Sequence, residues 1–218
     1  MKKLFLLLFF LGYGIYGIQA QDFKYKKSRK KDYIVQITTD LGSIDLILFD
    51  QTPIHKENFL TLASKNFYDS LTFHRVLEGF VVQGGDPNSY QGNEQRLGSG
   101  GPGYELTAEI DTTLFLHERG AIGAARMPDN INPERKSSGS QFYIVQGQEG
   151  AHHLDGEYTV FGEVIKGMEV VDLIAQQEVD RRGNPLKPIR MNVTVVRLKK
   201  KDIRKRYDYT YPEKRRDK

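Results

Sequence analysis

Short apolar segments separated by polar loops follow one another between residues 33 and 198, and the first two of them show the period of two residues that is typical of β-strands. The stretches YIVQIT and SIDLILF, on either side of a turn at residues 40–42, predict a hairpin at the start of a sheet. Short apolar runs between Gly-, Asn- and Pro-containing loops predict further strands, near residues 72–76, 80–83, 121–125, 141–145, 159–164 and 191–198. The pattern therefore indicates a mainly β protein.

Only two segments have the spacing of amphipathic helices. The first is predicted at residues 53–66, where Thr52 and Pro53 supply an N-cap and a first-turn proline, and apolar side chains recur every four residues. The second is predicted at residues 166–176, where apolar side chains again share one face. Many short strands with two helices favour a closed antiparallel sheet, so we expect an eight-stranded antiparallel β-barrel capped by two α-helices.

The first twenty residues follow a different pattern. Lys2 and Lys3 precede an uncharged run from Leu4 to Ile18, and Ala20 stands before a charged segment. The run is shorter than the roughly 18 residues of a membrane span, and this layout is typical of a secretory signal peptide. An uncleaved N-terminal anchor is the alternative, because Ile18 is a poor residue at its distance from a cut after Ala20. We therefore predict export to the periplasm or cell envelope, with secretion as a further outcome.

Length and composition fit one globular domain. With 218 residues, 39% of them apolar, and 12 Phe and 12 Tyr, the chain can bury a core, which excludes a disordered protein. Cysteine is absent, so no disulfide supports the fold and no lipid-bearing cysteine follows the signal. We expect a signal peptide at 1–20, a basic linker at 21–32, a globular domain at 33–198 and a basic tail at 199–218.

The net charge of +4 hides an asymmetry along the chain. Residues 21–32 hold six Lys/Arg against two Asp, and residues 199–218 hold ten against four Asp/Glu. Together with the two lysines of the signal, these end segments carry a net charge of +12. Since the whole chain carries +4, residues 33–198 carry −8. The basic ends are interpreted as solvated, flexible tails, and contact with an anionic surface is the alternative; no specific nucleic-acid partner is expected.

The stretch TFHRVLEGFVVQGGDP, residues 72–87, carries the candidate chemistry. Arg75 and Gln83 lie among apolar residues, where a charge costs several kcal/mol unless it is paired or has a function. Both have odd numbers and so share one face of an extended segment, which places them at one site. Without the other motifs, Arg75 would be interpreted as a structural arginine paired with a carboxylate. The neighbouring His74 has an even number and is expected to face the other side of the strand.

Two polar loops and a histidine pair complete the candidate features. Residues 88–103 hold a Gly-rich loop that is not a phosphate loop, because no GK[ST] follows it. The loop at 128–138 precedes the segment GSQFYIVQG. His152 and His153 are adjacent, so on an extended segment they point apart, and no Cys or third His stands at ligand spacing. We expect no metal and no cofactor.

The segments FHRVLEGFVVQGGDP, GAIGAAR, SGSQFYIVQ and HLDGEYTVFGEVIKGMEVVD occur in the order and approximate spacing of the cyclophilin-type peptidyl-prolyl isomerases, which the chain resembles over residues 33–198. The resemblance implies a monomeric enzyme that rotates X–Pro bonds in unfolded or flexible polypeptides. It assigns catalysis to Arg75 and Gln83. It assigns substrate binding to Phe80, Val81, Ala125, Arg126, Gln141, Tyr143, His153, Leu154 and Tyr158, with Ala125 and Arg126 acting through their backbone.

The chain departs from the best-known members of that family at several of these positions. Val81 replaces Met, Tyr143 replaces Phe, His153 replaces Trp and Tyr158 replaces His. Tyr143 brings a hydroxyl to the pocket wall that needs a partner or water. His153 removes the indole that contacts cyclosporin in sensitive members, so weak cyclosporin binding is expected. A proline-peptide-binding module or holdase chaperone with little isomerase activity is the alternative function.

Overall fold

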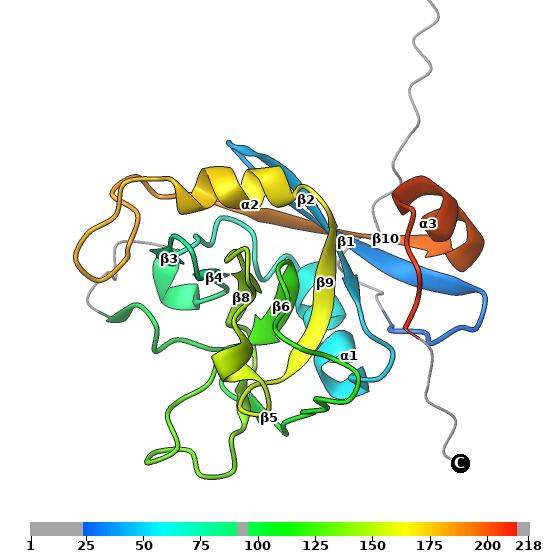
Figure 1. The fold of residues 1–218 in the computed structure, drawn as a ribbon, viewed down its shortest axis with the longest axis horizontal. Helices are drawn as coiled ribbons and strands as arrows, with labels where there is room; N and C mark the ends of the chain where they lie inside the picture. The colour runs from blue at the N-terminus through cyan, green and yellow to red at the C-terminus, as the bar shows by residue number, and fades with distance from the viewer. Residues whose placement is uncertain (1–23, 91–95, 213–218) are drawn as a thin grey trace, which may run out of the picture.

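Eight antiparallel strands in one sheet form the frame of the protein in a computed structural model that describes residues 24–90 and 96–212 (Figure 1). The strands of this sheet are β1 (Lys31–Thr39), β2 (Gly42–Leu48), β3 (Arg75–Leu77), β4 (Val81–Gly84), β6 (Ala121–Ala124), β8 (Phe142–Val145), β9 (Val160–Lys166) and β10 (Asn192–Lys199). A smaller sheet pairs β5 (Glu105–Leu106) with β7 (Ser137–Ser138). The predicted signal peptide lies outside the described residues.

The predicted closed barrel is not confirmed. The strand order is β10-β1-β2-β9-β6-β8-β4-β3, so β10 and β3 are the two edges and do not pair with each other. Only the segments that precede them meet. Three backbone hydrogen bonds join these segments, from the amides of Ser70, Met191 and Phe73 to the carbonyls of Met191, Leu71 and Ile189, and Thr72 forms an isolated bridge with Arg190. A longer ladder is prevented because β3 has three residues and Pro188, which has no N–H to donate, precedes β10.

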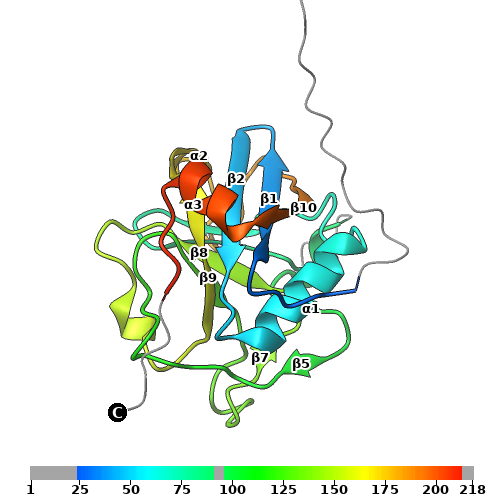
Figure 2. The ribbon, with the colours of Figure 1, turned by 90° about the vertical axis from the view of Figure 1, so that its right-hand side faces the viewer.

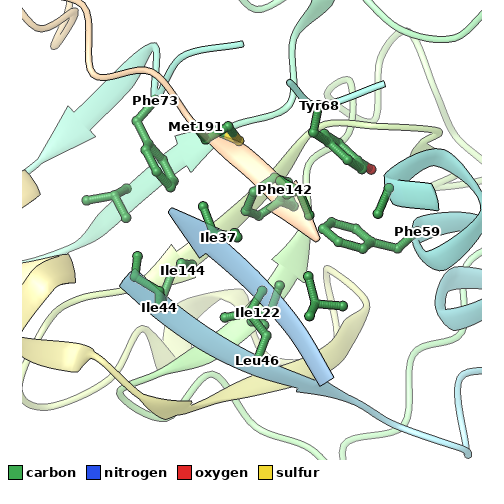
Figure 3. Close-up of a cluster of buried hydrophobic side chains, with 14 of the residues drawn as sticks. Ile37, Ile44, Leu46, Phe59, Tyr68, Phe73, Ile122, Phe142, Ile144 and Met191 are labelled. Atoms are coloured by element: carbon green, nitrogen blue, oxygen red, sulfur yellow. The ribbon is translucent and has the colours of Figure 1, made fainter. Parts of the chain in front are cut away.

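The two predicted helices are present as α1 (Pro53–Ser64) and α2 (Met168–Ala175), within two residues of their expected ends. The interior between the sheet and these helices is filled by buried apolar side chains, including Phe59 of α1, Phe142 of β8 and Met191 (Figure 3). Thr52 occupies the N-cap position of α1 as predicted, but its side chain makes no capping bond. The carboxylate of Glu109, distant in sequence, instead accepts from the amides of Ile54 and His55.

A third helix, α3 (Lys200–Tyr207), lies where the sequence predicted a flexible tail. Ile203 is fully buried against Ile34 and Ile47 on the outer face of the sheet, and three tyrosines at 207, 209 and 211 extend this apolar layer. The helix has a single buried apolar residue, so it lacks the repeating apolar stripe by which helices are found in sequence. Residues 199–212 are therefore a cover of the sheet and not a solvated tail.

A buried ionic cluster joins α1 to this C-terminal cover. The Lys56 ammonium is fully buried and donates to Asp32 at 2.7 Å, to Asp50 at 2.8 Å and to the Leu48 carbonyl at 2.8 Å. Lys200, at the start of α3, lies 2.8 Å from the other carboxylate oxygen of Asp50. All three protons of the Lys56 ammonium thus have acceptors, which is the condition under which a buried charge is tolerated.

No helix in the part of the chain that the structure describes is long and apolar enough to cross a membrane.

Candidate active site

Arg75 and Gln83 face each other across a hairpin of β3 and β4. The sequence analysis placed them on one face of a single extended segment, but the chain turns at residues 78–80, and the two residues are cross-strand partners. Their side chains meet as expected, with the Arg75 Nη1 donating to Gln83 Oε1 at 3.3 Å. Arg75 is half-buried, so its guanidinium is fixed on one side and keeps donors for a ligand on the other.

A chain of side-chain amides fixes this arginine to the Gly-rich loop. Gln83 Nε2 donates to Gln141 Oε1 at 3.1 Å, and Gln141 Nε2 donates to the carbonyls of Gly98 and Gly100 at 3.0 and 2.8 Å. The buried carboxylate of Asp86 holds the same loop by accepting from the amide of Gly98. The loop is therefore a support for the arginine, through two glutamines that each use both ends of the amide.

Beside Arg75 the surface opens into an apolar pocket of about 340 Å³. The structure brings nine of the predicted site residues to its lining: Arg75, Phe80, Val81, Gln83, Ala125, Arg126, Tyr143, Leu154 and Tyr158. The other two stand at its border. Gln141 lines an adjoining hollow of about 600 Å³ that extends along the Gly-rich loop, and the exposed His153 ring packs on Phe80 with 5.1 Å between centroids.

The Tyr143 hydroxyl, which needed a partner in the pocket wall, finds one in the protein interior. It lies 2.9 Å from Nε2 of the fully buried His117, whose Nδ1 lies 2.7 Å from the Asp155 carboxylate. This assigns Nδ1–H of His117 as donor to Asp155 and Nε2 as acceptor from Tyr143. The Tyr143 ring lies over Gly123, where an added Cβ would fall 2.2 Å from the ring. The ring therefore presents only carbon to the pocket.

His117 and Asp155 were not predicted as part of the site, because nothing in their spacing indicates that they meet. Burial lowers the pKa of His117, so the imidazole is neutral at pH 7. Burial also raises the pKa of the Tyr143 hydroxyl well above its usual value, so it remains a donor. His74 is also buried, in a different place, on the side of the chain that faces away from the groove. Its burial likewise lowers its pKa.

We expect the buried His117 to make folding stability depend on pH. Its pKa in the folded state lies below the value of about 6.5 in the unfolded chain. Below about pH 6.5 the unfolded state therefore binds more protons than the folded state, and stability falls as the pH decreases. Urea unfolding at pH 7.5 and 5.5 would measure this loss, which His117→Gln should reduce while His74 maintains the remainder. An unchanged pH dependence in His117→Gln would contradict the expectation.

Arg126 and Ala125 differ in what they leave free for a ligand. The Ala125 amide donates to the Gln141 carbonyl, and its own carbonyl accepts from Ser138. No hydrogen bond within the described part of the chain uses the backbone N–H or C=O of Arg126. The Arg126 side chain is held away, with its guanidinium 4.5 Å above the Tyr158 ring and bonded to Glu157 and Asp129. Of the two predicted backbone positions, Arg126 is thus the one available to a bound peptide.

A second network that the sequence analysis missed positions the turn that carries Phe80. Gln146 accepts from the Gly79 amide at 2.8 Å and donates to Asp172 of α2 at 2.8 Å. Arg119 bridges the Asp172 carboxylate and the Gln146 carbonyl. These contacts join residues far apart in sequence, and they fix the β3–β4 turn to α2.

The described residues hold no group of three or more His, Asp or Glu side chains that could bind a metal ion. His152 and His153 diverge in a short 3₁₀ helix: His152 turns to Asp155 at 2.9 Å, while His153 packs on Phe80.

The site thus combines a half-buried arginine, a pocket with apolar walls, and an unpaired backbone N–H and C=O at Arg126, in a mainly β protein. The family model of the cyclophilin-type peptidyl-prolyl cis-trans isomerases matches residues 34–196. The chain therefore belongs to this family.

Two curated relatives match this chain along most of their own length. Peptidyl-prolyl cis-trans isomerase CYP18-1 of Arabidopsis thaliana is 37% identical over 162 residues, which cover 72% of this chain and 92% of the relative. A peptidyl-prolyl cis-trans isomerase of Helicobacter pylori is 37% identical over 165 residues, or 74% and 91% of the two chains.

Solved structures give the same result. A cyclophilin-type isomerase of Cryptosporidium parvum superposes with a TM-score of 0.66 at 29% identity, covering 76% of this chain and 98% of that one. The same protein, crystallised in the presence of the dipeptide Ala-Pro, superposes with a TM-score of 0.63 at 30% identity, covering 75% and 97%.

Proposed function

We propose that this protein is a peptidyl-prolyl cis-trans isomerase that rotates X–Pro bonds in unfolded or flexible polypeptides. The observation that carries the proposal is the Arg75 guanidinium, fixed by Gln83 at the edge of a pocket lined by Phe80, Tyr143 and Leu154. A proline ring fits such an apolar pocket, and its position there brings the prolyl nitrogen toward the arginine.

The reaction needs no nucleophile, because no covalent bond is made or broken. Rotation about the X–Pro bond breaks amide resonance, and the uncatalysed barrier is roughly 18–20 kcal/mol. In the transition state the prolyl nitrogen regains its lone pair and accepts a hydrogen bond that it cannot accept in the planar amide. A donor aimed at that nitrogen therefore binds the transition state more strongly than the substrate.

Different residues of the site make different contributions to binding this transition state. Arg75 supplies a permanently charged donor, Gln83 fixes its orientation, and the free backbone of Arg126 binds the flanking peptide. The apolar walls exclude water from the proline ring. A rate gain of about 10⁴ to 10⁵ requires these contacts to lower the barrier by roughly 5.5–7 kcal/mol, since each 1.36 kcal/mol is tenfold.

Exchange NMR on an Ala-Pro-Phe peptide, with the protein in catalytic amounts, tests the proposal directly. Isomerisation is slow without enzyme, so acceleration appears as cis/trans exchange peaks at short mixing times. Binding of the peptide without acceleration by a folded protein would reject the isomerase and support the proline-peptide-binding module or holdase chaperone.

We also propose that the protein is bacterial, is exported, and assists folding in the periplasm or cell envelope. The support is the arrangement of the first twenty residues, with two lysines, an uncharged run and Ala20 before a charged segment. Mass spectrometry of the protein recovered from the periplasm of a bacterial host would test this, because cleavage after Ala20 gives an N-terminus at Gln21. Retention in the cytoplasm with Met1 intact would reject it.

Cyclosporin is expected to inhibit this protein weakly, because His153 offers an imidazole where the drug meets an indole in sensitive cyclophilins. His153 is exposed and packs on Phe80 at the pocket border, so a larger ring can be placed there without disturbing the core. His153→Trp should lower the inhibition constant at least about tenfold, which corresponds to one buried aromatic contact of roughly 1.4 kcal/mol. Equal inhibition of both forms would show that another position determines resistance.

A further inference from the structure

Two basic segments from opposite ends of the chain come together on one face of the molecule. They are residues 24–31 and residues 199–206, here called the basic surface. Together they hold twelve Lys/Arg against the single acidic residue Asp202. All of the basic side chains except Lys200 are exposed.

Backbone contacts hold the two segments side by side. Lys31 of β1 pairs with Lys199 of β10, and the Lys200 amide donates to the Lys30 carbonyl at 2.9 Å. Arg197 donates to the Lys26 carbonyl at 3.0 Å. Figure 2 shows the result from this side: α3 and the segment that enters β1 lie on the same face, on either side of the β1–β10 pair. The fold thus assembles a patch of charge that neither segment has alone.

The rest of the molecule has the opposite charge. Residues 33–198 carry −8, so the protein has one strongly basic face on an acidic body. Strands β3 and β4, which carry Arg75 and Gln83, lie at the other end of the molecule from α3 (Figure 1). An anionic surface would therefore attract the basic surface, repel the body, and leave the groove facing away from it.

We propose that the basic surface docks the protein on the anionic phospholipid headgroups of a membrane. Lysine and arginine are spread along an irregular segment and a short helix, which suits many separate headgroups better than one specific ligand. Exposed Lys and Arg side chains at a membrane surface each add to the attraction by anionic headgroups, and this patch supplies eleven of them. The docked enzyme keeps its groove open to polypeptides, a consequence that depends on the proposed function.

The protein that begins at Gln21, the N-terminus proposed for the mature form, can be tested by sedimentation with vesicles of phosphatidylcholine, with and without about 30 mol% of the anionic lipid phosphatidylglycerol. The test variant is the triple substitution Lys27→Gln, Lys201→Gln, Lys205→Gln, whose side chains are exposed and make no described contact. The matched control is Arg181→Gln, Arg182→Gln, Lys187→Gln, which removes the same charge from an exposed loop outside the basic surface.

We expect the parent protein and the control to bind the anionic vesicles, and the test variant to bind about a hundredfold more weakly, since each basic residue contributes about fivefold. Binding should also fall steeply with salt, because exposed charges are screened. Equal weakening of both variants, or equal binding to vesicles without phosphatidylglycerol, would overturn the proposal. Binding of an oligonucleotide that depends on the basic surface, without binding of vesicles, would also overturn it. The assay does not measure isomerisation, so its failure is distinct from a failure of the proposed function.

Discussion

Replacing Arg75 with Ala should reduce kcat/KM of isomerisation by about 10² to 10³-fold or more, the cost of removing one preorganised donor from a transition state. The fold should persist, because Arg75 is half-buried and its side chain makes one described hydrogen bond, to Gln83 at 3.3 Å. No ion pair involves Arg75 among residues 24–90 and 96–212. This geometry favours the donor role over that of a structural arginine paired with a carboxylate. Exchange NMR and thermal unfolding of the same preparation measure both effects.

Arg75→Lys is the informative companion to Arg75→Ala. Lysine keeps the charge but loses the planar fork that bonds Gln83 and a ligand together, so its activity should lie between those of the parent and the alanine variant. Arg190→Ala is a matched control, because this exposed arginine also makes one described hydrogen bond, to the Ser70 carbonyl, outside the groove. Full activity in Arg75→Ala, or an equal loss in Arg190→Ala, would refute the assignment.

Replacing Lys56 with Ala should lower the free energy of unfolding by about 3–5 kcal/mol, the cost of removing one partner of a buried ion pair. The substitution leaves Asp32, which is 2% exposed, without its ammonium partner at 2.7 Å, and removes a donor from the Leu48 carbonyl. It also weakens the anchor of α3, because Asp50 joins Lys56 to Lys200. Urea unfolding at pH 7 is the measurement.

Lys65→Ala is the matched control for this prediction. Lys65 directly follows α1 and is exposed, so its loss should change stability by no more than about 0.5 kcal/mol. Lys56→Met tests whether lost packing volume accounts for the effect, since methionine fills much of the space but cannot bond the carboxylates. If Lys56→Met were as stable as the parent protein, the ionic contacts would contribute nothing net, and the predicted loss would be a cavity effect.

The strands of the larger sheet and the helices α1 and α2 were predictable because each carries its own local pattern, although β3 begins at Arg75 and not at residue 72. The two-residue strands β5 and β7 carry no such pattern and were not predicted. The hairpin β1–β2 joins two segments rich in β-branched apolar residues at Gly42, and α2 keeps its apolar residues on one face, so short-range chemistry indicates both. Helix α3 escaped prediction because it has one buried residue, Ile203, and its stability depends on a sheet formed elsewhere in the chain. The carboxylate that caps α1 was not predicted either, because Glu109 belongs to a segment distant in sequence from the helix.

The reaction class could be assigned from the sequence, because Arg75, Gln83, Phe80 and the segment GSQF stand in the order of a known family whose motifs are short and continuous. How Arg75 is held, what the Tyr143 hydroxyl contacts, and where the two basic segments lie became known from the folded structure. The physical reason is the range of the contacts. His117 and Tyr143 are 26 residues apart, and Lys26 and Arg197 are 171 apart, so their meeting depends on the path of the whole chain and leaves no periodic trace in the sequence.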